Sequence, residues 1–425
     1  RDILQSAQTG GRLPARIRAS NIKPLLAPAS RSKGFARMSP RKPHVDLSSY
    51  YKLMFDESYP LEDYINNLYA TGYFEMVEPV YVQKSFYIPN DPLINSQYYL
   101  NLIKATEAWD ITQGNPSIVI GIIDTGGDLD HPDLQDNIYV DPADPTDGID
   151  NDNDGYIDNN RGWDFSGADI SLIGSPGFTG DNNPSVYTGN RFAHGTMVAG
   201  CASAATNDGV GISGVGFNTK LMFTKHYADN QPSNYNSYSS NLYEGVLYAA
   251  THGAKIINCS WGNPFYSGIG QDIIKHVTLD LGCLVIAAAG NSNSETPLYP
   301  AAYEYVLSVA SSDENDLRSA FSNYGITVDI TAPGSNIYTT NYNDGYRTDS
   351  GTSLSAPIVS GAAALVWAHN PTFTPLQVAE QLRISADETF YDNNPAFINK
   401  LGKGRLDIAR ALAFQSPAVR AIHQG

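Results

Sequence analysis

The chain has 425 residues, 42% of them hydrophobic and 17% charged, so it can bury a core and global disorder is excluded. Its net charge of −17 divides into +8 over residues 1–50 and −25 over the remainder. Residues 51–425 are acidic enough to repel phosphate backbones. The sequence also contains no run of 18 apolar residues, the length that a membrane-spanning helix needs. We therefore expect neither a nucleic-acid partner nor a membrane span.

The first 87 residues divide into two parts. Residues 1–43 are rich in Arg, Ser, Ala and Pro without a sustained period, which predicts a basic mobile tail. Residues 44–87 predict a small α+β module. It has a strand near residues 48–56, a helix over 60–73 with a Pro start and a Gly stop, and a strand over 74–86. A unit of about 40 residues is too small to be stable alone without a partner surface.

Strand and helix patterns alternate from residue 88 to residue 413, and residues 414–425 read as a tail. Short apolar runs predict strands at residues 117–124, 220–226, 255–260, 283–290, 305–310 and 328–331. Helical patterns occupy residues 106–112, 194–205, 241–253, 271–282, 353–369 and 375–386. Apolar strands without polar alternation indicate a sheet buried on both faces, so we predict a doubly wound parallel α/β domain. Residues 141–190 lack apolar periodicity and read as an excursion over the surface.

Three polar residues stand where sites form in such sheets, at a strand end or a helix start. Asp124 ends a strand, His194 begins a helix, and Ser353 begins another with Pro357 in its expected first turn. A serine hydroxyl becomes a nucleophile when an imidazole takes its proton and a carboxylate fixes the imidazole tautomer. Each residue alone could be a turn former or a helix cap. Together they are better explained as one catalytic site.

A fourth residue, Asn291, follows the apolar run 283–290. Asn is a common turn former, which is the simpler interpretation. Its side-chain amide can also donate to the negative charge that develops on a substrate carbonyl oxygen. Loss of such a donor typically lowers turnover by about 10²–10³.

The order Asp124, His194, Asn291, Ser353, with the flanks D-T-G, H-G-T, A-A-A-G-N and G-T-S, resembles the subtilisin-like serine proteases, in particular their thermitase-like branch, over residues 90–413. The resemblance implies that Asp124 orients the imidazole, His194 is the general base and then acid, and Ser353 is the nucleophile. Asn291 and the Ser353 N–H would form the oxyanion hole. It further implies protein or peptide substrates, a monomer, and secretion. The chain opens on Arg1 without an apolar signal stretch, so we expect that a signal peptide is not part of it.

The same resemblance implies a primary specificity pocket between two strands, which Pro300 would close. Its implied lining residues are Ser260, Trp261, Gly262, Ala288, Ala289 and Gly290. The chain departs from many relatives at Leu354, where they carry Met after the nucleophile. A thioether can be oxidised to a sulfoxide, so we expect this enzyme to keep its activity in peroxide.

Residues 147–158 (DGIDNDNDGYID) have the D-x-D-x-D-G spacing of a calcium loop. Asp150, Asp152 and Asp154 can converge if Gly155 permits a sharp turn, with Asp158 and the Tyr156 carbonyl as further oxygens. The twelfth position is Arg161 rather than Glu, so the loop is not an EF-hand. The alternative is a solvated acidic loop.

A second calcium site rests on the resemblance alone. The side chains of Asp91, Asp133 and Asp208 match ligands of the family's high-affinity site. The carbonyls that would complete the shell belong to Ala205, Val210 and Ile212. Ca²⁺ is thus the expected cofactor.

By resemblance, residues 44–87 are an inhibitory prosegment that acts on the chain's own active site, with self-cleavage near residues 84–88. The alternative is an unrelated accessory domain. For the whole chain we expect a calcium-stabilised serine endopeptidase made as a zymogen. Two other classes remain open: a subtilase-fold binding protein that has lost turnover, and a lipid or ester hydrolase with the same triad.

Overall fold

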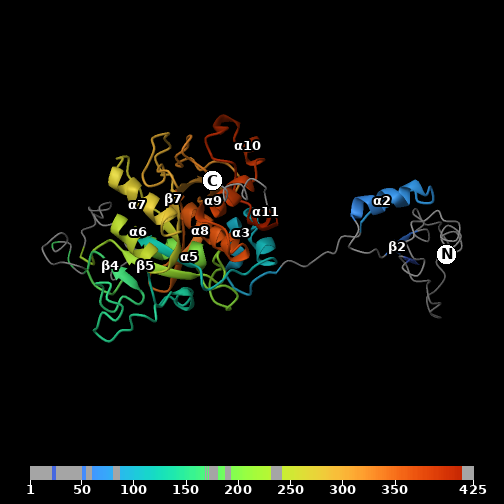
Figure 1. The fold of residues 1–425 in the computed structure, drawn as a ribbon. Coiled ribbons are helices and arrows are strands. Elements are labelled where there is room, and N and C mark those ends of the chain that lie inside the picture. The colour runs from blue at the N-terminus through green and yellow to red at the C-terminus, as the bar shows by residue number, and fades with distance from the viewer. Residues whose placement is uncertain are drawn as a thin grey trace. The chain divides into compact units, whose positions relative to one another are not determined.

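The computed structural model describes residues 22–24, 50–53, 60–79, 87–167, 169, 171, 180–186, 193–230 and 242–413. The chain forms two compact units, Arg1–Ser85 and Phe86–Gly425, and each is described by itself (Figure 1).

The first unit contains one helix and a strand pair among its described residues. Strand β1 (Ile22–Pro24) pairs antiparallel with β2 (Tyr51–Leu53), and α2 spans Leu61–Ala70. Helix α2 follows Pro60, as predicted. Within residues 1–43, which show no periodic pattern, residues 22–24 form β1 through their pairing with β2. Of the strand predicted over 74–86, residues 74–79 are not a strand, and residues 80–86 lie outside the described residues.

The second unit is built on a seven-stranded sheet whose paired neighbours all run parallel, in the order β4-β5-β3-β6-β7-β8-β9. Its strands are β3 (Val119–Asp124), β4 (Gly162–Asp164), β5 (Lys220–Lys225), β6 (Ala254–Cys259), β7 (Leu284–Ala288), β8 (Val306–Ser312) and β9 (Ile330–Pro333). Every residue of β3, β7 and β8 is buried, because helices cover both faces of the sheet. The predicted doubly wound parallel fold is therefore confirmed.

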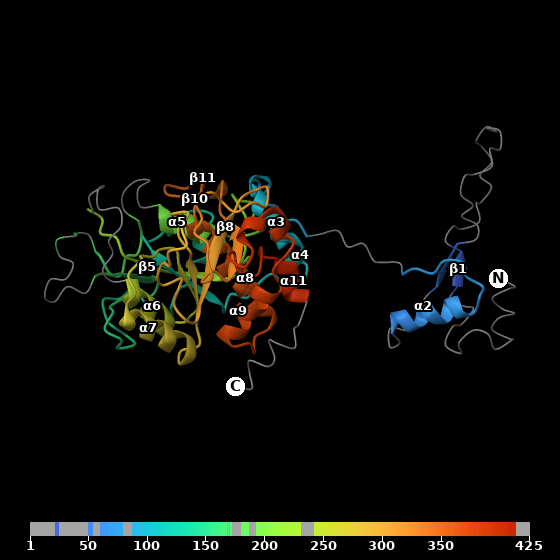
Figure 2. The same ribbon diagram turned by 90° about the horizontal axis from the view of Figure 1, so that it is seen from above.

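Helices pack on the two faces in separate apolar clusters. One cluster joins the sheet to α5 (His194–Ser203), α8 (Thr352–His369) and α9 (Pro375–Ile384), and the other to α6 (Leu242–Thr251) and α7 (Gly268–Leu279). Helices α6 and α7 lie side by side in both ribbon views (Figures 1 and 2). The smaller elements are α3 (Tyr98–Leu102), α4 (Ala105–Trp109), α10 (Phe390–Asn393), α11 (Ile408–Ala413) and the hairpin β10 (Ile337–Asn341) with β11 (Gly345–Asp349).

Two details differ from the sequence analysis. Strand β4, within the stretch 141–190, joins the sheet edge beside β5. Helix α8 begins at Thr352, so Pro357 is its sixth residue and lies beyond the first turn. Its missing N–H is therefore one that the helix would otherwise use.

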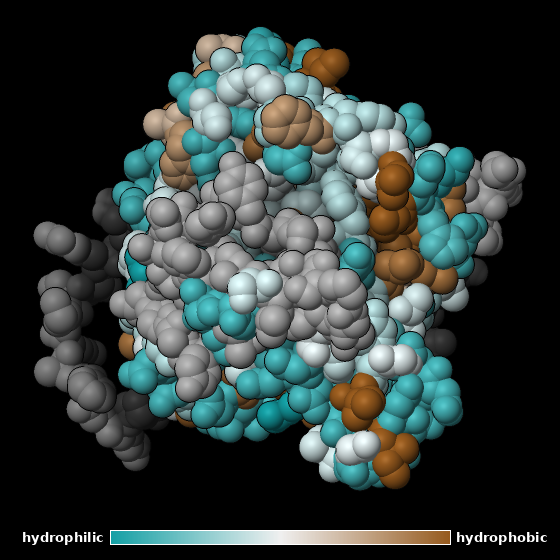
Figure 3. Space-filling view, turned by 90° about the vertical axis from the view of Figure 1, so that its left-hand side faces the viewer, coloured by the Kyte–Doolittle hydropathy of each residue, from teal (hydrophilic) through white to brown (hydrophobic). Residues whose placement is uncertain are grey.

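The described part of the chain contains no helix that is long and apolar enough to cross a membrane. The coloured residues of the face in Figure 3 are mostly hydrophilic, and its apolar residues form small separate groups.

Candidate active site

The sheet and two helix starts supply the three polar residues singled out from the sequence. Asp124 is the last residue of the buried interior strand β3, His194 is the first residue of α5, and Ser353 is the second residue of α8. The carboxyl end of a parallel strand is where sites form in doubly wound folds. The chain thus delivers a carboxylate, an imidazole and a hydroxyl from elements that pack on one another.

The imidazole of His194 is held by Asp124. Its Nδ1 lies 2.8 and 2.9 Å from the two carboxylate oxygens, and Asp124 is only 4% exposed. Burial by itself would lower the pKa of His194, but the charge and hydrogen bond of Asp124, with a smaller effect from Asp349, raise it above its ordinary value. Because a carboxylate accepts the hydrogen on Nδ1, the neutral imidazole has its free lone pair on Nε2.

The Ser353 side chain is half-buried at the amino end of α8. Its Oγ donates to the backbone carbonyl of Ser260 at 3.1 Å, while the Ser260 Oγ donates to the Ser353 carbonyl at 2.7 Å. Ser260 follows strand β6, so these two bonds tie the start of the helix to the carboxyl end of the sheet.

The amide of Asn291 is oriented by Thr352. Its Oδ1 accepts hydrogen bonds from the backbone N–H and the hydroxyl of Thr352, both at 2.9 Å. Because Oδ1 faces Thr352, Nδ2 lies on the opposite side of the amide group. A Cβ built on Gly351 would lie 3.4 Å from Asn291 Nδ2 and 3.6 Å from the Ser353 N. Two N–H donors therefore flank the same small residue.

Both predicted pocket segments approach Leu298. A Cβ built on Gly290 would lie 2.3 Å from Leu298 Cδ1, and one built on Gly262 would lie 3.4 Å from Leu298 Cβ. The backbone of Asn263 pairs with Tyr299, which anchors this segment beside the first strand. Among the other implied lining residues, Ser260, Ala288, Ala289 and Gly290 are buried, Trp261 is half-buried and Gly262 is exposed. Leu298 lies two residues before Pro300, the residue that was predicted to close the pocket.

Asp133, one of the implied calcium ligands, is a buried carboxylate with an incomplete set of partners. One oxygen accepts the Ile212 N–H at 2.8 Å, and within the described residues the other has no hydrogen-bond partner. Burial raises the pKa of Asp133 to about 8 against that hydrogen bond, and the charges of Asp208 and Asp91 add to the rise. The Asp133 backbone carbonyl accepts the Ala205 N–H. Asp133 is thus a buried carboxylate that has one oxygen without a donor among the described residues and that two other carboxylates influence.

The other two carboxylates of that group bind the adjacent loop. Asp91 accepts the hydroxyl of Ser213 at 2.6 Å and the N–H groups of Asn207 and Asp208 at 2.9 and 3.2 Å. Asp208 accepts the Val210 N–H at 2.8 Å. Asp91 thus fixes the loop that carries the predicted carbonyl ligands, whose role stays a prediction.

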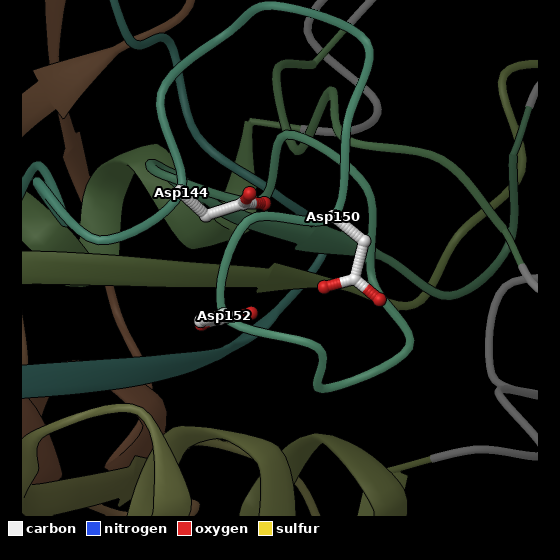
Figure 4. Close-up of side chains that lie close together, drawn as sticks. All are labelled: Asp144, Asp150 and Asp152. Carbon is white, nitrogen blue, oxygen red and sulfur yellow. The ribbon is translucent and has the colours of Figure 1, made fainter.

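The acidic loop gathers a different trio from the one predicted. Among the described residues, one set of His, Cys, Asp or Glu side chains has three ligand atoms all within 4.8 Å of one another: Asp144, Asp150 and Asp152 (Figure 4). Asp154 instead binds His252 Nε2 at 2.5 Å, and Asp158 accepts two N–H groups at 2.9 and 2.8 Å. The turn expected at Gly155 is present with a φ of 96°.

Asp144 was not among the predicted ligands. It is fully buried and precedes Asp150, the first residue of the D-x-D-x-D-G spacing, by six residues. Its oxygens accept the N–H groups of Asn151 and Asn159 at 2.8 and 2.9 Å. The available signal was a further Asp upstream in an already acidic stretch. Only the folded loop shows that it turns toward Asp150 and Asp152.

Comparison with known proteins identifies the family. A sequence profile of the subtilase family matches residues 115–404. Thermitase from Thermoactinomyces vulgaris is 33% identical over 333 residues, which cover 77% of this chain and 100% of thermitase. Halolysin from Haloferax mediterranei is 30% identical over 371 residues, which cover 86% of this chain and 63% of halolysin. A solved structure of a protease from Pseudoalteromonas arctica matches with a TM-score of 0.60 at 26% identity, covering 76% of this chain and 98% of that one.

The profile spans more than half of the chain, and Asp124, His194, Asn291 and Ser353 all lie inside it. The matched segment also contains all seven strands of the parallel sheet. The chain belongs to the subtilase family and is a subtilisin-like serine endopeptidase.

Proposed function

We propose that this endopeptidase cleaves peptide bonds with Ser353 as nucleophile, His194 as general base and then acid, and Asp124 as the group that orients the imidazole. The observation that carries the proposal is the contact of His194 Nδ1 with both oxygens of Asp124. It directs the basic lone pair to Nε2, which can take a proton from a serine hydroxyl. The Ser353 hydroxyl, which donates to the Ser260 carbonyl, would turn toward His194 for this step.

In the first half of the reaction, Ser353 Oγ forms a bond to the scissile carbonyl carbon and its proton moves to His194 Nε2. The carbonyl π electrons move onto oxygen, and Asn291 Nδ2 with the Ser353 N–H would donate to this oxyanion. Collapse of the intermediate breaks the C–N bond, and His194 returns the proton to the leaving amine. Water, deprotonated by the same imidazole, then hydrolyses the acyl-enzyme and restores Ser353.

We also propose that calcium stabilises the enzyme at two places. Asp133, with its orphaned buried oxygen and raised pKa, fits a divalent cation, and Asp91 and Asp208 adjoin it. The trio Asp144, Asp150 and Asp152 offers the oxygen ligands that calcium prefers. A bound cation would supply positive charge that lets these carboxylates ionise together. Its role is structural in this proposal, and no chemical step depends on it.

Residues 44–87 are proposed to be an inhibitory prosegment, which makes the chain a zymogen. Secretion is proposed from the family resemblance and from the acidity of the catalytic unit. Support for the prosegment comes from its size and from the division of the chain between Ser85 and Phe86. A unit so small gains stability from a larger partner.

Expression of wild type beside Ser353→Ala tests the assignment of the nucleophile and the zymogen together. Wild type should cleave casein and release an amino-terminal piece, while Ser353→Ala should remain full length and inactive. Casein cleavage by a correctly folded Ser353→Ala protein at a rate near that of wild type would refute the nucleophile. An active wild type that keeps its amino-terminal unit would refute only the zymogen.

A further inference from the structure

The backbone carbonyl of Ser353 cannot obtain its usual helical hydrogen bond. In an α-helix each carbonyl accepts the N–H of the residue four positions later. For Ser353 this residue is Pro357, which lies inside α8 and has no N–H. The carbonyl of the proposed nucleophile therefore depends on a donor from outside the helix backbone.

That donor is the hydroxyl of Ser260, at 2.7 Å, and it belongs to a longer series of hydrogen bonds. Asn258 Nδ2 donates to Ser260 Oγ at 2.9 Å, and Ser360 Oγ donates to Asn258 Oδ1 at 3.0 Å. Asn258 and Ser360 are fully buried, and Ser260 is 4% exposed. The series leaves α8 at Ser360, passes through the end of β6, and returns to α8 at Ser353.

Each hydroxyl of the series has a single hydrogen to give. Ser360 Oγ has two acceptors within reach, Asn258 Oδ1 at 3.0 Å and the Ala356 carbonyl at 3.1 Å, and its bond to Asn258 favours the amide orientation in which the NH₂ group faces Ser260. Ser260 then accepts from Asn258 and gives its own hydrogen to the Ser353 carbonyl. With the amide reversed, the hydrogen of Ser260 would go to Asn258 and the Ser353 carbonyl would lose its donor.

We propose that Asn258 and Ser360 are positioning residues for Ser353, acting through Ser260 to replace the hydrogen bond that Pro357 removes. The residue whose carbonyl they hold also carries the nucleophilic hydroxyl and one proposed oxyanion donor. Ordering its backbone supports both groups in the geometry that the transition state needs. This inference rests on the proposed role of Ser353 as nucleophile.

Two variants and a matched control test the proposal. Asn258→Asp places an acceptor-only group against Ser260, and Ser360→Ala removes the hydroxyl that orients the amide. Loss of one hydrogen bond of this kind from the transition state lowers a rate constant roughly three- to tenfold. We therefore expect kcat to fall by about that factor, while KM changes by less than about twofold. The control is Ser355→Ala. It removes a buried hydroxyl from the same helix, and that hydroxyl has no partner among the described residues.

Pro357→Ala supplies a rescue, because it restores an N–H four residues after Ser353. In this background Ser360→Ala should change kcat by less than about twofold. A purely structural role for Ser360 would lower kcat and the melting temperature alike in both backgrounds.

Two results would overturn the proposal: equal losses of kcat in the two backgrounds, or a Ser360→Ala enzyme with the same kcat as Ser355→Ala. The comparison of Ser360→Ala with Ser355→Ala needs no Pro357 variant. It therefore tests the positioning role even if Pro357→Ala does not fold. A Ser353→Ala variant in the same assay separates the nucleophilic role of Ser353 from the positioning role of Asn258 and Ser360. Activity of Ser353→Ala near the wild-type level would refute the nucleophile, whereas a Ser353→Ala enzyme reduced by several orders of magnitude with an unaffected Ser360→Ala would refute only the positioning role.

Discussion

His194 Nδ1 lies 2.8 and 2.9 Å from the two carboxylate oxygens of Asp124, a residue 70 positions earlier at the end of the interior strand β3. Asp124 is 4% exposed and the imidazole is half-exposed. Because burial lowers the local dielectric constant, the electrostatic interaction between the two groups is stronger than it would be in water. This contact raises the pKa of His194. His194 must be neutral to accept a proton, so activity should rise with pH through that raised value.

Asp349 gives a way to shift this titration without touching the triad. Its charge also raises the pKa of His194, so Asp349→Asn should move the acidic limb of kcat/KM to lower pH, most clearly at low salt. The matched control is Asp280→Asn, which removes an exposed charge at the end of α7. An acidic limb that stays in place or moves to higher pH would contradict this role of Asp349.

Asp133 should make stability depend on pH in opposite ways with and without calcium. Its pKa is about 8 in the folded protein, against about 4 in an unfolded chain. Between these values the folded state holds a proton that the unfolded state has lost, so the stability of the metal-free protein should fall as pH rises from about 4 to 8. In EDTA at pH 9, Asp133→Asn should therefore melt above wild type, and in calcium it should melt below it.

Thermal melts at pH 5 and pH 9, with EDTA or calcium, check this expectation. Wild type should also digest itself faster in EDTA. If EDTA left the melting temperature of wild type unchanged, this result would contradict calcium binding at both proposed sites.

Leu298 should limit the size of the substrate side chain that enters the pocket. Its side chain lies against both Gly262 and Gly290, so Leu298→Ala opens space between the two strands. The ratio of kcat/KM for Phe over Ala at the cleaved residue should rise on the order of tenfold, since each methylene in such a pocket is worth about 1–3 kcal/mol. Peptide substrates that differ only at this position measure it. The control is Leu317→Ala, at an exposed leucine, which should not change this ratio. An unchanged ratio in Leu298→Ala would contradict the role of Leu298 in limiting the size of the pocket.

Leu354 should protect the enzyme from peroxide. It follows the proposed nucleophile and is 2% exposed. Leu354→Met conserves volume, so it should be active, but it should lose activity in hydrogen peroxide as the thioether becomes a sulfoxide. Leu365→Met, buried further along the same helix, is the control. Rapid inactivation of wild type by peroxide would show that another residue is the sensitive one.

The parallel sheet was predictable because its main strands contain short apolar runs without polar alternation and its helices have clear starts. His194 and Ser353 begin or nearly begin helices in the structure, and Asp124 ends a strand, as expected. Strand β4 was not predictable from an apolar pattern, since it has three residues and ends in Asp164. That carboxylate is buried beside Lys225 of β5 at 2.8 Å, a pairing that no local pattern reveals.

The parts of the site built on loops were the least predictable. The spacing of residues 147–158 predicted convergence of Asp150, Asp152 and Asp154, but Asp154 binds His252, which lies 98 residues away. Asp144 takes its place because the loop folds back on itself. Both outcomes depend on tertiary contacts that the spacing of carboxylates along the chain does not encode.

The most direct test of the account is labelling of the mature enzyme with a fluorophosphonate, followed by mass spectrometry of its peptides. We predict one phosphonylated residue, Ser353, with labelling lost in His194→Ala and strongly slowed in Asp124→Asn. An enzyme that cleaves casein while Ser353 stays unmodified, or that reacts equally fast without the imidazole, would contradict the proposed triad.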